Sequence, residues 1–156
     1  MTRPLRPSPP KENTKMKKII VSGLIIELFL LSGCASGIVG KIPQVDADFA
    51  TVYIARKSGA IGCGNAFLIQ LNDKDFIRID CGMKTDFKIP AGEKIKISSV
   101  SSFVPDEFLL TPVTGESYYF GMDCNFGACW FDKLNREEYD RMAESCGKDL
   151  VIEQGK

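Results

Sequence analysis

The stretch FLIQLNDKDFIRI, residues 67–79, decides the fold, because it shows two alternating apolar runs around a short polar segment. We take Asn72-Asp73-Lys74 as a three-residue loop, which brings apolar side chains of both runs onto one face. The facing pairs are then Phe67 with Ile79, Ile69 with Ile77, and Leu71 with Asp75. This stretch therefore predicts a β-hairpin with one buried face.

Further short apolar or alternating runs, separated by turns rich in Pro and Gly, continue along the chain. The expected strands cover residues 49–55, 64–71, 76–81, 87–89, 94–100, 107–110, 117–124 and 129–134. Seven to eight short strands at this spacing are typical of an antiparallel β-sandwich. We therefore predict a mainly β domain over residues 49–146, followed by a tail at 147–156.

One amphipathic helix is expected to close this domain. Asn135 is suited to cap the helix, and Glu138 stands where its side chain can return the capping hydrogen bond. The apolar side chains that follow at helical spacing are Tyr139, Met142, Ala143 and Cys146. This stripe is expected to pack against the sandwich.

The N-terminal part reads MKKIIVSGLIIELFLLSGC over residues 16–34. Two lysines precede an apolar run at 19–31, which contains Glu27 and is too short to span a bilayer as a helix. The segment Leu31-Ser32-Gly33-Cys34 resembles the lipobox of bacterial lipoproteins. The alternative is an ordinary secretory signal followed by a chance cysteine.

The lipobox resemblance implies cleavage before Cys34, a diacylated thiol, and acylation of the new amino group. Residues 1–33 are then the signal peptide; we expect the true start at Met16, with 1–15 a spurious extension. Residues 34–48 become a lipidated tether that holds the protein at the membrane. Ala35 after the cysteine resembles enterobacterial sorting to the outer membrane, so we expect a lipid-anchored protein facing the periplasm.

Charge and composition argue against nucleic-acid binding and against histidine-based catalysis or metal binding. The 20 basic and 20 acidic side chains balance, but residues 1–33 hold six basic and two acidic ones, so the remainder has 14 against 18. An acidic mature domain argues against a nucleic-acid partner. The chain has no histidine, the commonest general base and metal ligand. We therefore predict no catalytic residue, no cofactor and no metal.

A serine–lysine pair is a catalytic alternative. Ser98, Ser99, Ser101 and Ser102 follow Lys96 closely. A serine-rich loop beside a solvated lysine is the commoner explanation of this pattern.

Four segments, ATVYIARK, KIPAGEKIKIS, TGESYYF and FDKLNREEYDRM, occur in this order between residues 47 and 146. In this respect the chain resembles small bacterial envelope lipoproteins that carry a domain of unknown function. The resemblance implies a β-sandwich tethered by lipid, and it supplies no catalytic residue.

The cysteines predict disulfides in an exported protein. Cys124 and Cys129 bracket the four-residue loop NFGA and should face each other across a hairpin, close enough to bond. Cys63 and Cys81 are a second candidate pair, one diagonal step apart, and Cys146 could pair with either of them. The alternative is a zinc site formed by Cys63, Cys81, Cys124 and Cys129.

These observations favour a binding or accessory module that contacts an envelope protein. An inhibitor of a secreted hydrolase such as lysozyme is the main alternative, since the short motif SGA at residues 58–60 resembles one found in such inhibitors. A purely structural spacer is the third.

Overall fold

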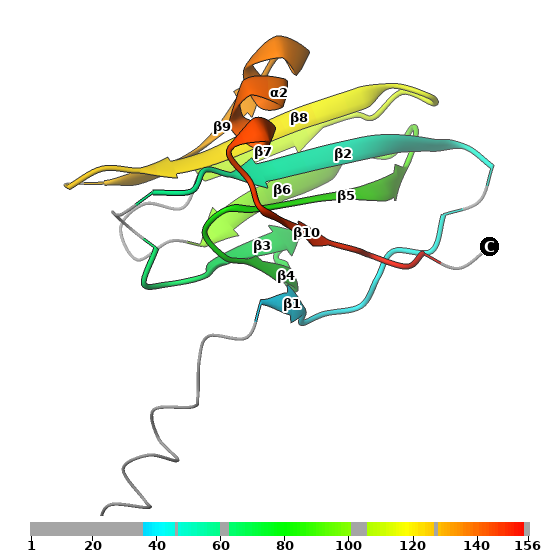
Figure 1. Ribbon diagram of the computed structural model, residues 1–156. Helices are drawn as coiled ribbons and strands as arrows, with labels where there is room; N and C mark the ends of the chain where they lie inside the picture. Colours follow the sequence, from blue (N-terminus) through cyan, green and yellow to red (C-terminus); the bar gives the residue numbers. More distant parts are fainter. Residues whose placement is uncertain (1–35, 46, 60–62, 101–105, 127, 155–156) are drawn as a thin grey trace, which may run out of the picture. The chain divides into compact units, whose positions relative to one another are not determined.

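The computed structural model describes residues 36–45, 47–59, 63–100, 106–126 and 128–154 (Figure 1). Within these ranges the chain forms strands and one helix, α2, at Arg136–Glu144. The strands are β1 (Gly37–Ile38), β2 (Phe49–Arg56), β3 (Phe67–Leu71), β4 (Lys74–Ile79), β5 (Met83–Pro90), β6 (Ile95–Val100), β7 (Asp106–Leu110), β8 (Ser117–Cys124), β9 (Cys129–Leu134) and β10 (Lys148–Leu150). The lipobox residues Leu31, Ser32, Gly33 and Cys34 lie outside the described part. No helix in that part is long and apolar enough to cross a bilayer.

The strands form two five-stranded sheets that pack face to face. Sheet A has the order β1-β4-β3-β6-β7, and sheet B has the order β10-β5-β2-β8-β9 (Figure 1). The mainly β class is confirmed, but the finer prediction of seven to eight antiparallel strands is wrong. β2 pairs with β8 and β10 with β5 in parallel, and β1 and β10 are additional strands.

The hairpin at 67–79 has the expected pairs Phe67 with Ile79 and Ile69 with Ile77. The predicted loop is wrong, however, because Leu71 faces Lys74 rather than Asp75. Asn72 and Asp73 form a two-residue turn, with φ of 50° and 63°, as tight hairpin turns require. A bulge between Ile69 and Gln70 restores the register, and the consecutive residues Phe76 and Ile77 are both buried.

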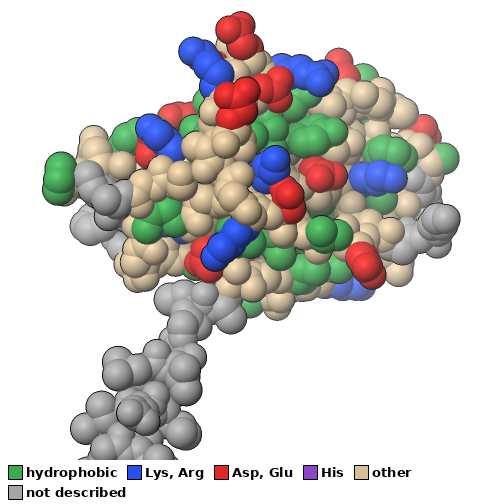
Figure 2. All heavy atoms as spheres, viewed as in Figure 1, with side chains coloured by type: hydrophobic (Ala, Val, Ile, Leu, Met, Phe, Trp, Pro, Cys, Tyr) green, Lys and Arg blue, Asp and Glu red, His purple; other side chains and the backbone are tan. Residues whose placement is uncertain are grey.

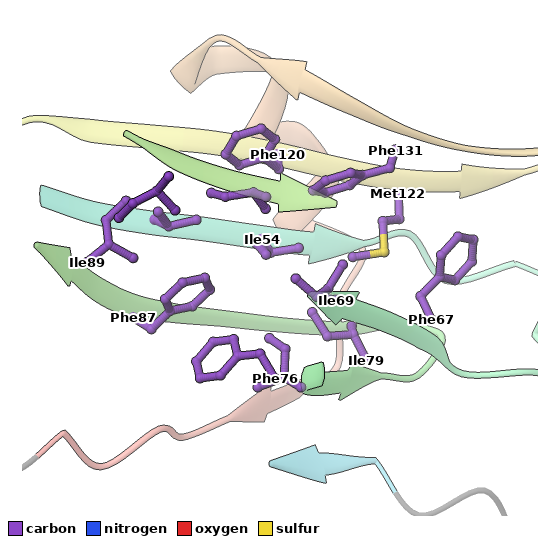
Figure 3. Packing of buried hydrophobic residues seen from close by; sticks show 14 of the residues in the cluster. Ile54, Phe67, Ile69, Phe76, Ile79, Phe87, Ile89, Phe120, Met122 and Phe131 are labelled. Atoms are coloured by element: carbon purple, nitrogen blue, oxygen red, sulfur yellow. The ribbon is translucent and has the colours of Figure 1, made fainter. Parts of the chain in front are cut away.

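The core lies between the sheets. Alternate residues of β2, Ala50, Val52 and Ile54, are fully buried. They belong to one apolar cluster with side chains from each of the strands β3 to β9 (Figure 3). The rings of Phe76 on β4 and Phe87 on β5 join the two sheets, with centroids 4.8 Å apart. Burial of this apolar surface is the main stabilising contribution to the fold.

Helix α2 covers the outer face of sheet B. Its capping box is confirmed, because Asn135 accepts a hydrogen bond from the Glu138 amide and Glu138 accepts one from the Asn135 amide. Tyr139 and Ala143 are buried against the outward-facing side chains of β2, while Met142 and Cys146 are partly buried in the same cluster. The expected stripe therefore lies on the sheet.

The described part of the segment predicted as a lipidated tether, residues 34–48, packs along sheet A. Gly37 and Ile38 pair with β4, and the amides of Val39 and Gly40 both donate to the Phe76 carbonyl at 2.9 and 3.1 Å. Ile42 packs against the core. Residues 37–42 of the predicted tether are thus packed on the sandwich, while the lipidated tether itself stays a prediction.

The C-terminal tail also packs on the domain. β10 pairs with β5, and Thr85 donates to the Leu150 carbonyl at 2.7 Å. Gln154 donates to the carbonyls of Lys88 and Pro43, at 2.7 and 3.3 Å. Tail and N-terminal segment thus meet along one side of the sandwich.

Candidate binding site at the disulfide end

One end of the sandwich holds both disulfides, and we call it the disulfide end. Strands β2, β4 and β8 finish here, and β9 begins here (Figure 1). Its described residues are 56–59, 63–65, 79–82 and 123–130 without 127.

The β8–β9 hairpin has the expected register, with Cys124 facing Cys129 and Met122 facing Phe131. The two cysteines are disulfide-bonded, with Cα atoms 4.1 Å apart. Between them the Asn125 side chain accepts a hydrogen bond from the Ala128 amide, and the Asn125 amide donates to the Ala128 carbonyl, both at 2.9 Å. Gly127 lies outside the described residues. The tip is therefore closed both by covalent and by hydrogen bonds.

Phe126 stands at this tip and is 96% exposed. An aromatic side chain usually gains about 1.5–3 kcal/mol from burial, so full exposure forgoes a large stabilisation of the fold. Aromatic side chains are also enriched where proteins bind one another. A disulfide-closed loop with an exposed Phe is thus suited to insert into an apolar pocket of a partner.

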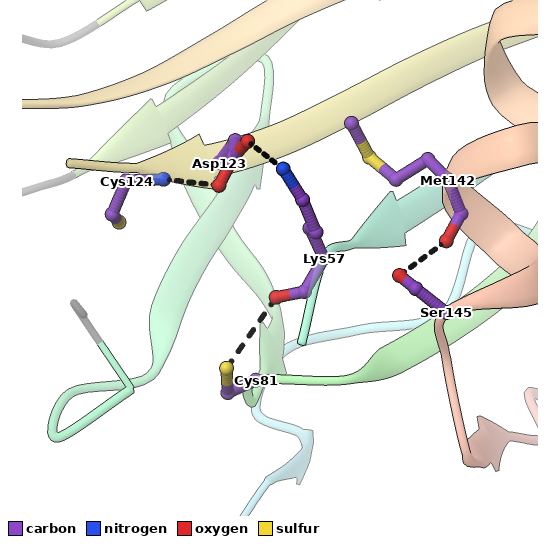
Figure 4. A network of polar contacts seen from close by, with 6 residues as sticks. All are labelled: Lys57, Cys81, Asp123, Cys124, Met142 and Ser145. Carbon is purple, nitrogen blue, oxygen red and sulfur yellow. Dashed lines mark hydrogen bonds and ion pairs between the residues drawn. The ribbon is translucent and has the colours of Figure 1, made fainter. Parts of the chain in front are cut away.

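Beside the tip, Lys57 and Asp123 form an ion pair of 3.0 Å between the ends of β2 and β8 (Figure 4). The other oxygen of Asp123 accepts a hydrogen bond from the Cys124 amide at 2.8 Å. Cys81 Sγ lies 3.4 Å from the Lys57 carbonyl oxygen. These contacts surround a cavity of about 150 Å³ lined by Arg56, Lys57, Ser58, Gly59, Cys81, Asp123 and Cys124.

Arg56 lines this cavity and is only 2% exposed. Its guanidinium donates to the Ile79 carbonyl at 2.8 Å and lies 4.5 Å from the ring centroid of Phe67. Burial lowers the pKa of Arg56, an effect partly opposed by the charge of Asp80. Arg56 therefore links β2 in sheet B to β3 and β4 in sheet A.

Cys63 and Cys81 form the second disulfide, with Cα atoms 5.1 Å apart. The four cysteines of the alternative zinc site are thus joined in two disulfides. Cys146 is a free thiol that donates to the Arg56 carbonyl at 3.3 Å, and burial raises its pKa. Among the described residues no group of three or more metal-ligating side chains comes together.

The serine–lysine alternative has no support in the geometry. Lys96 forms ion pairs with Asp73 and Glu107, and the hydrogen bond to Asp73 raises the pKa of Lys96. Ser98 and Ser99 are buried in β6, whereas Ser101 and Ser102 lie outside the described residues. A lysine with a raised pKa stays protonated and does not serve as a base.

A larger groove of about 560 Å³ lies between α2, β5 and β10. Its aromatic wall is formed by Tyr53 and Tyr139, whose ring centroids are 5.8 Å apart, and burial raises the pKa of Tyr139. Of its charged side chains, Lys84 pairs with Asp149, and Asp140 pairs with Arg136. Figure 2 shows side chains of both signs interspersed over this face. The Lys84–Asp149 pair joins β5 to β10, whereas the Arg136–Asp140 pair lies within α2.

The functional residues that the sequence predicted are only part of this site. The two disulfides place Cys63, Cys81, Cys124 and Cys129 together at one end. Arg56, Lys57, Asp123 and Phe126 were not predicted. A signal existed for two of them: Arg56 continues the inward alternation of β2, and Phe126 is an aromatic residue inside a loop closed by cysteines.

Fold and site together define a two-sheet β-sandwich with a disulfide-closed hairpin tip. The sequence matches no family model, and neither a curated protein nor a solved structure matches it. The resemblance to envelope lipoproteins therefore stays a hypothesis from the sequence.

Proposed function

We propose that this protein is a lipid-anchored envelope lipoprotein that acts as a binding or accessory module through its disulfide end. The contact residue is Phe126, and its near-complete exposure on a closed loop is the observation that carries the proposal. The partner is an envelope protein with an apolar pocket for this side chain. No catalysis is proposed.

The anchor rests on the sequence. Leu31-Ser32-Gly33-Cys34 stands directly behind a charged and apolar leader. Two or more acyl chains hold a protein at a membrane stably, whereas one chain gives only marginal binding. Triacylated Cys34 needs no help from the domain, and Ala35 favours the periplasmic face of the outer membrane. Two disulfides fit such an oxidising compartment.

The binding role rests on preorganisation. A loop that is already closed loses little conformational entropy when a partner binds, so more of the contact energy appears as affinity. The ion pair of Lys57 with Asp123 fixes the base of the same hairpin. An anchoring aromatic side chain with polar neighbours has the anatomy of an interface hot spot.

The same observation keeps the alternative of a hydrolase inhibitor open. A narrow disulfide-closed loop with a protruding Phe126 also suits insertion into an enzyme cleft. Residual lysozyme activity in the presence of the purified protein separates the two functions. Inhibition that is lost in Phe126→Ala would favour the inhibitor.

Photo-crosslinking in whole envelopes tests the binding module. A photoreactive phenylalanine analogue at position 126 is compared with the same analogue at Val113, which is 53% exposed and lies in the loop between β7 and β8. We expect a discrete adduct from position 126 only. Equal labelling from both positions would contradict the proposal and favour a structural spacer.

A further inference from the structure

The N-terminal segment of the domain is fastened along the edge of sheet A, and this shortens the connection to the anchor. Gly37 pairs with Arg78, and Ile38 pairs with Ile77. Gly40 lies so close to the Asp75 backbone that a β-carbon there would overlap the carbonyl oxygen. Further along the segment, the side-chain amide of Gln154 donates a hydrogen bond of 3.3 Å to the Pro43 carbonyl.

The remaining length of chain is short. Only Ala35 and Ser36 separate Cys34 from β1. Three residue steps span at most about 11 Å, whereas a free tether from Cys34 to the start of β2 would span up to about 50 Å. The headgroup layer of one leaflet is about 5–7 Å thick. An acylated Cys34 therefore leaves β1 within or directly above this layer.

We propose that the β1–β4 edge of the sandwich lies against the phospholipid headgroups of the membrane; the proposal rests on the lipid anchor proposed above. Ile38 and Val39, 43% and 48% exposed, supply apolar contact at this edge. Lys41, Lys74 and Arg78 are exposed near them, as is the carboxylate of Asp75 in β4; the exposed Asp73 in the adjoining turn pairs with Lys96. Such a mixture of apolar and cationic side chains fits an anionic membrane surface.

This placement orients the candidate binding site. β1 and β10 border the same side of the sandwich, whereas β9 is the opposite edge of sheet B (Figure 1). Four strand spacings separate β10 from β9, about 19 Å at the usual interstrand distance. The β8–β9 tip with Phe126 is thus held away from the bilayer, where a partner has access.

Tryptophan quenching by lipids tests the membrane contact. The full lipoprotein is reconstituted into phosphatidylethanolamine–phosphatidylglycerol vesicles that contain a nitroxide on a fraction of the headgroups. Trp130, the single tryptophan, reports on β9. Two further proteins carry Trp130→Phe with either Arg78→Trp or Val113→Trp. Arg78 is distant from Cys34 in sequence, so it approaches the lipid only if β1 holds the edge there.

We expect severalfold stronger quenching at position 78 than at positions 113 and 130. Gly40→Ala in the Arg78→Trp protein should lower it to the level of position 113. Gly147→Ala, where a β-carbon meets nothing within 4 Å, should leave it unchanged. Should Gly40→Ala not fold, the comparison of the three positions decides alone.

The mass of the Cys34 peptide separates this inference from the proposed anchor. Equal quenching at all three positions with an acylated Cys34 would overturn the membrane contact alone. Retained quenching at position 78 in a folded Gly40→Ala protein would overturn it as well. An unacylated Cys34 would overturn both the anchor and the inference that rests on it.

Discussion

Gly40 packs against the backbone of Asp75 with no room for a side chain between them. The amide of Gly40 donates to the carbonyl of the next residue, Phe76, at 3.1 Å. This contact fixes the N-terminal segment on β4, and it turns an apparent linker into a part of sheet A.

Replacement of Gly40 by Ala should therefore destabilise the domain. A β-carbon that overlaps backbone forces the segment off β4, which we expect to lower the free energy of unfolding by about 1–3 kcal/mol. Urea denaturation followed by Trp130 fluorescence measures the change. Gly147→Ala is the matched control, and equal stabilities of the two variants would contradict the packing described here.

The two disulfides should differ in their contributions. They close loops of different length, with sequence separations of 5 for Cys124–Cys129 and 18 for Cys63–Cys81. The loop-entropy relation gives about 2 kcal/mol for the first and about 3 kcal/mol for the second. Double Cys→Ser variants, compared by urea denaturation, should follow this order with the fold retained. A larger loss for the Cys124–Cys129 variant would contradict the entropic account.

Arg56 should stabilise the disulfide end through the contacts of its buried guanidinium. Arg56→Met keeps the buried stem but leaves the Ile79 carbonyl without this donor, at a cost of about 1–3 kcal/mol. Lys57→Met, at a lysine whose side chain is 53% exposed, should change stability by less than about 1 kcal/mol. Equal losses of unfolding free energy in the two variants would contradict this difference between the buried Arg56 and the exposed Lys57.

The Cys146 thiol should react slowly at neutral pH. Burial raises its pKa, so the folded protein holds less of the nucleophilic thiolate than the unfolded chain does. Iodoacetamide labelling of the Cys146 peptide, with and without urea, measures the difference. Labelling of the folded protein at neutral pH as fast as in urea would contradict the burial.

The same shift gives a pH dependence of stability. The folded pKa lies above the unfolded one, so the stabilisation is complete below the ordinary cysteine value of about 8.5 and is lost as pH rises through the folded pKa. Cys146→Ala should remove this contribution. A stability profile unchanged by the substitution would contradict it.

The sequence predicted those features that depend on local pattern. Alternation located β2, β6 and β8, and the capping box of Asn135 and Glu138 located the start of α2. The sequence did not predict β1 and β10. These strands of two and three residues are too short to show a period, and they pair with strands distant in the sequence. The parallel pairing of β2 with β8 is likewise a property of the whole chain.

The candidate site was predicted in the same partial way. Opposed positions on a hairpin were enough to pair Cys124 with Cys129. The convergence of Lys57 with Asp123, which are 66 residues apart, depends on the parallel pairing of β2 with β8 and has no local sign. Phe126 becomes a candidate only when its exposure is known.

The mass of the N-terminal peptide of the membrane-extracted protein tests the central claim most directly. We predict that the mature chain begins at Cys34, with a diacylglycerol thioether on its sulfur and an acyl group on its amine. Cys34→Ala should incorporate no labelled palmitate and should accumulate as an unprocessed or misprocessed precursor. An unmodified Cys34 within a longer chain, or palmitate in the Cys34→Ala protein, would contradict the account of a lipid-anchored binding module.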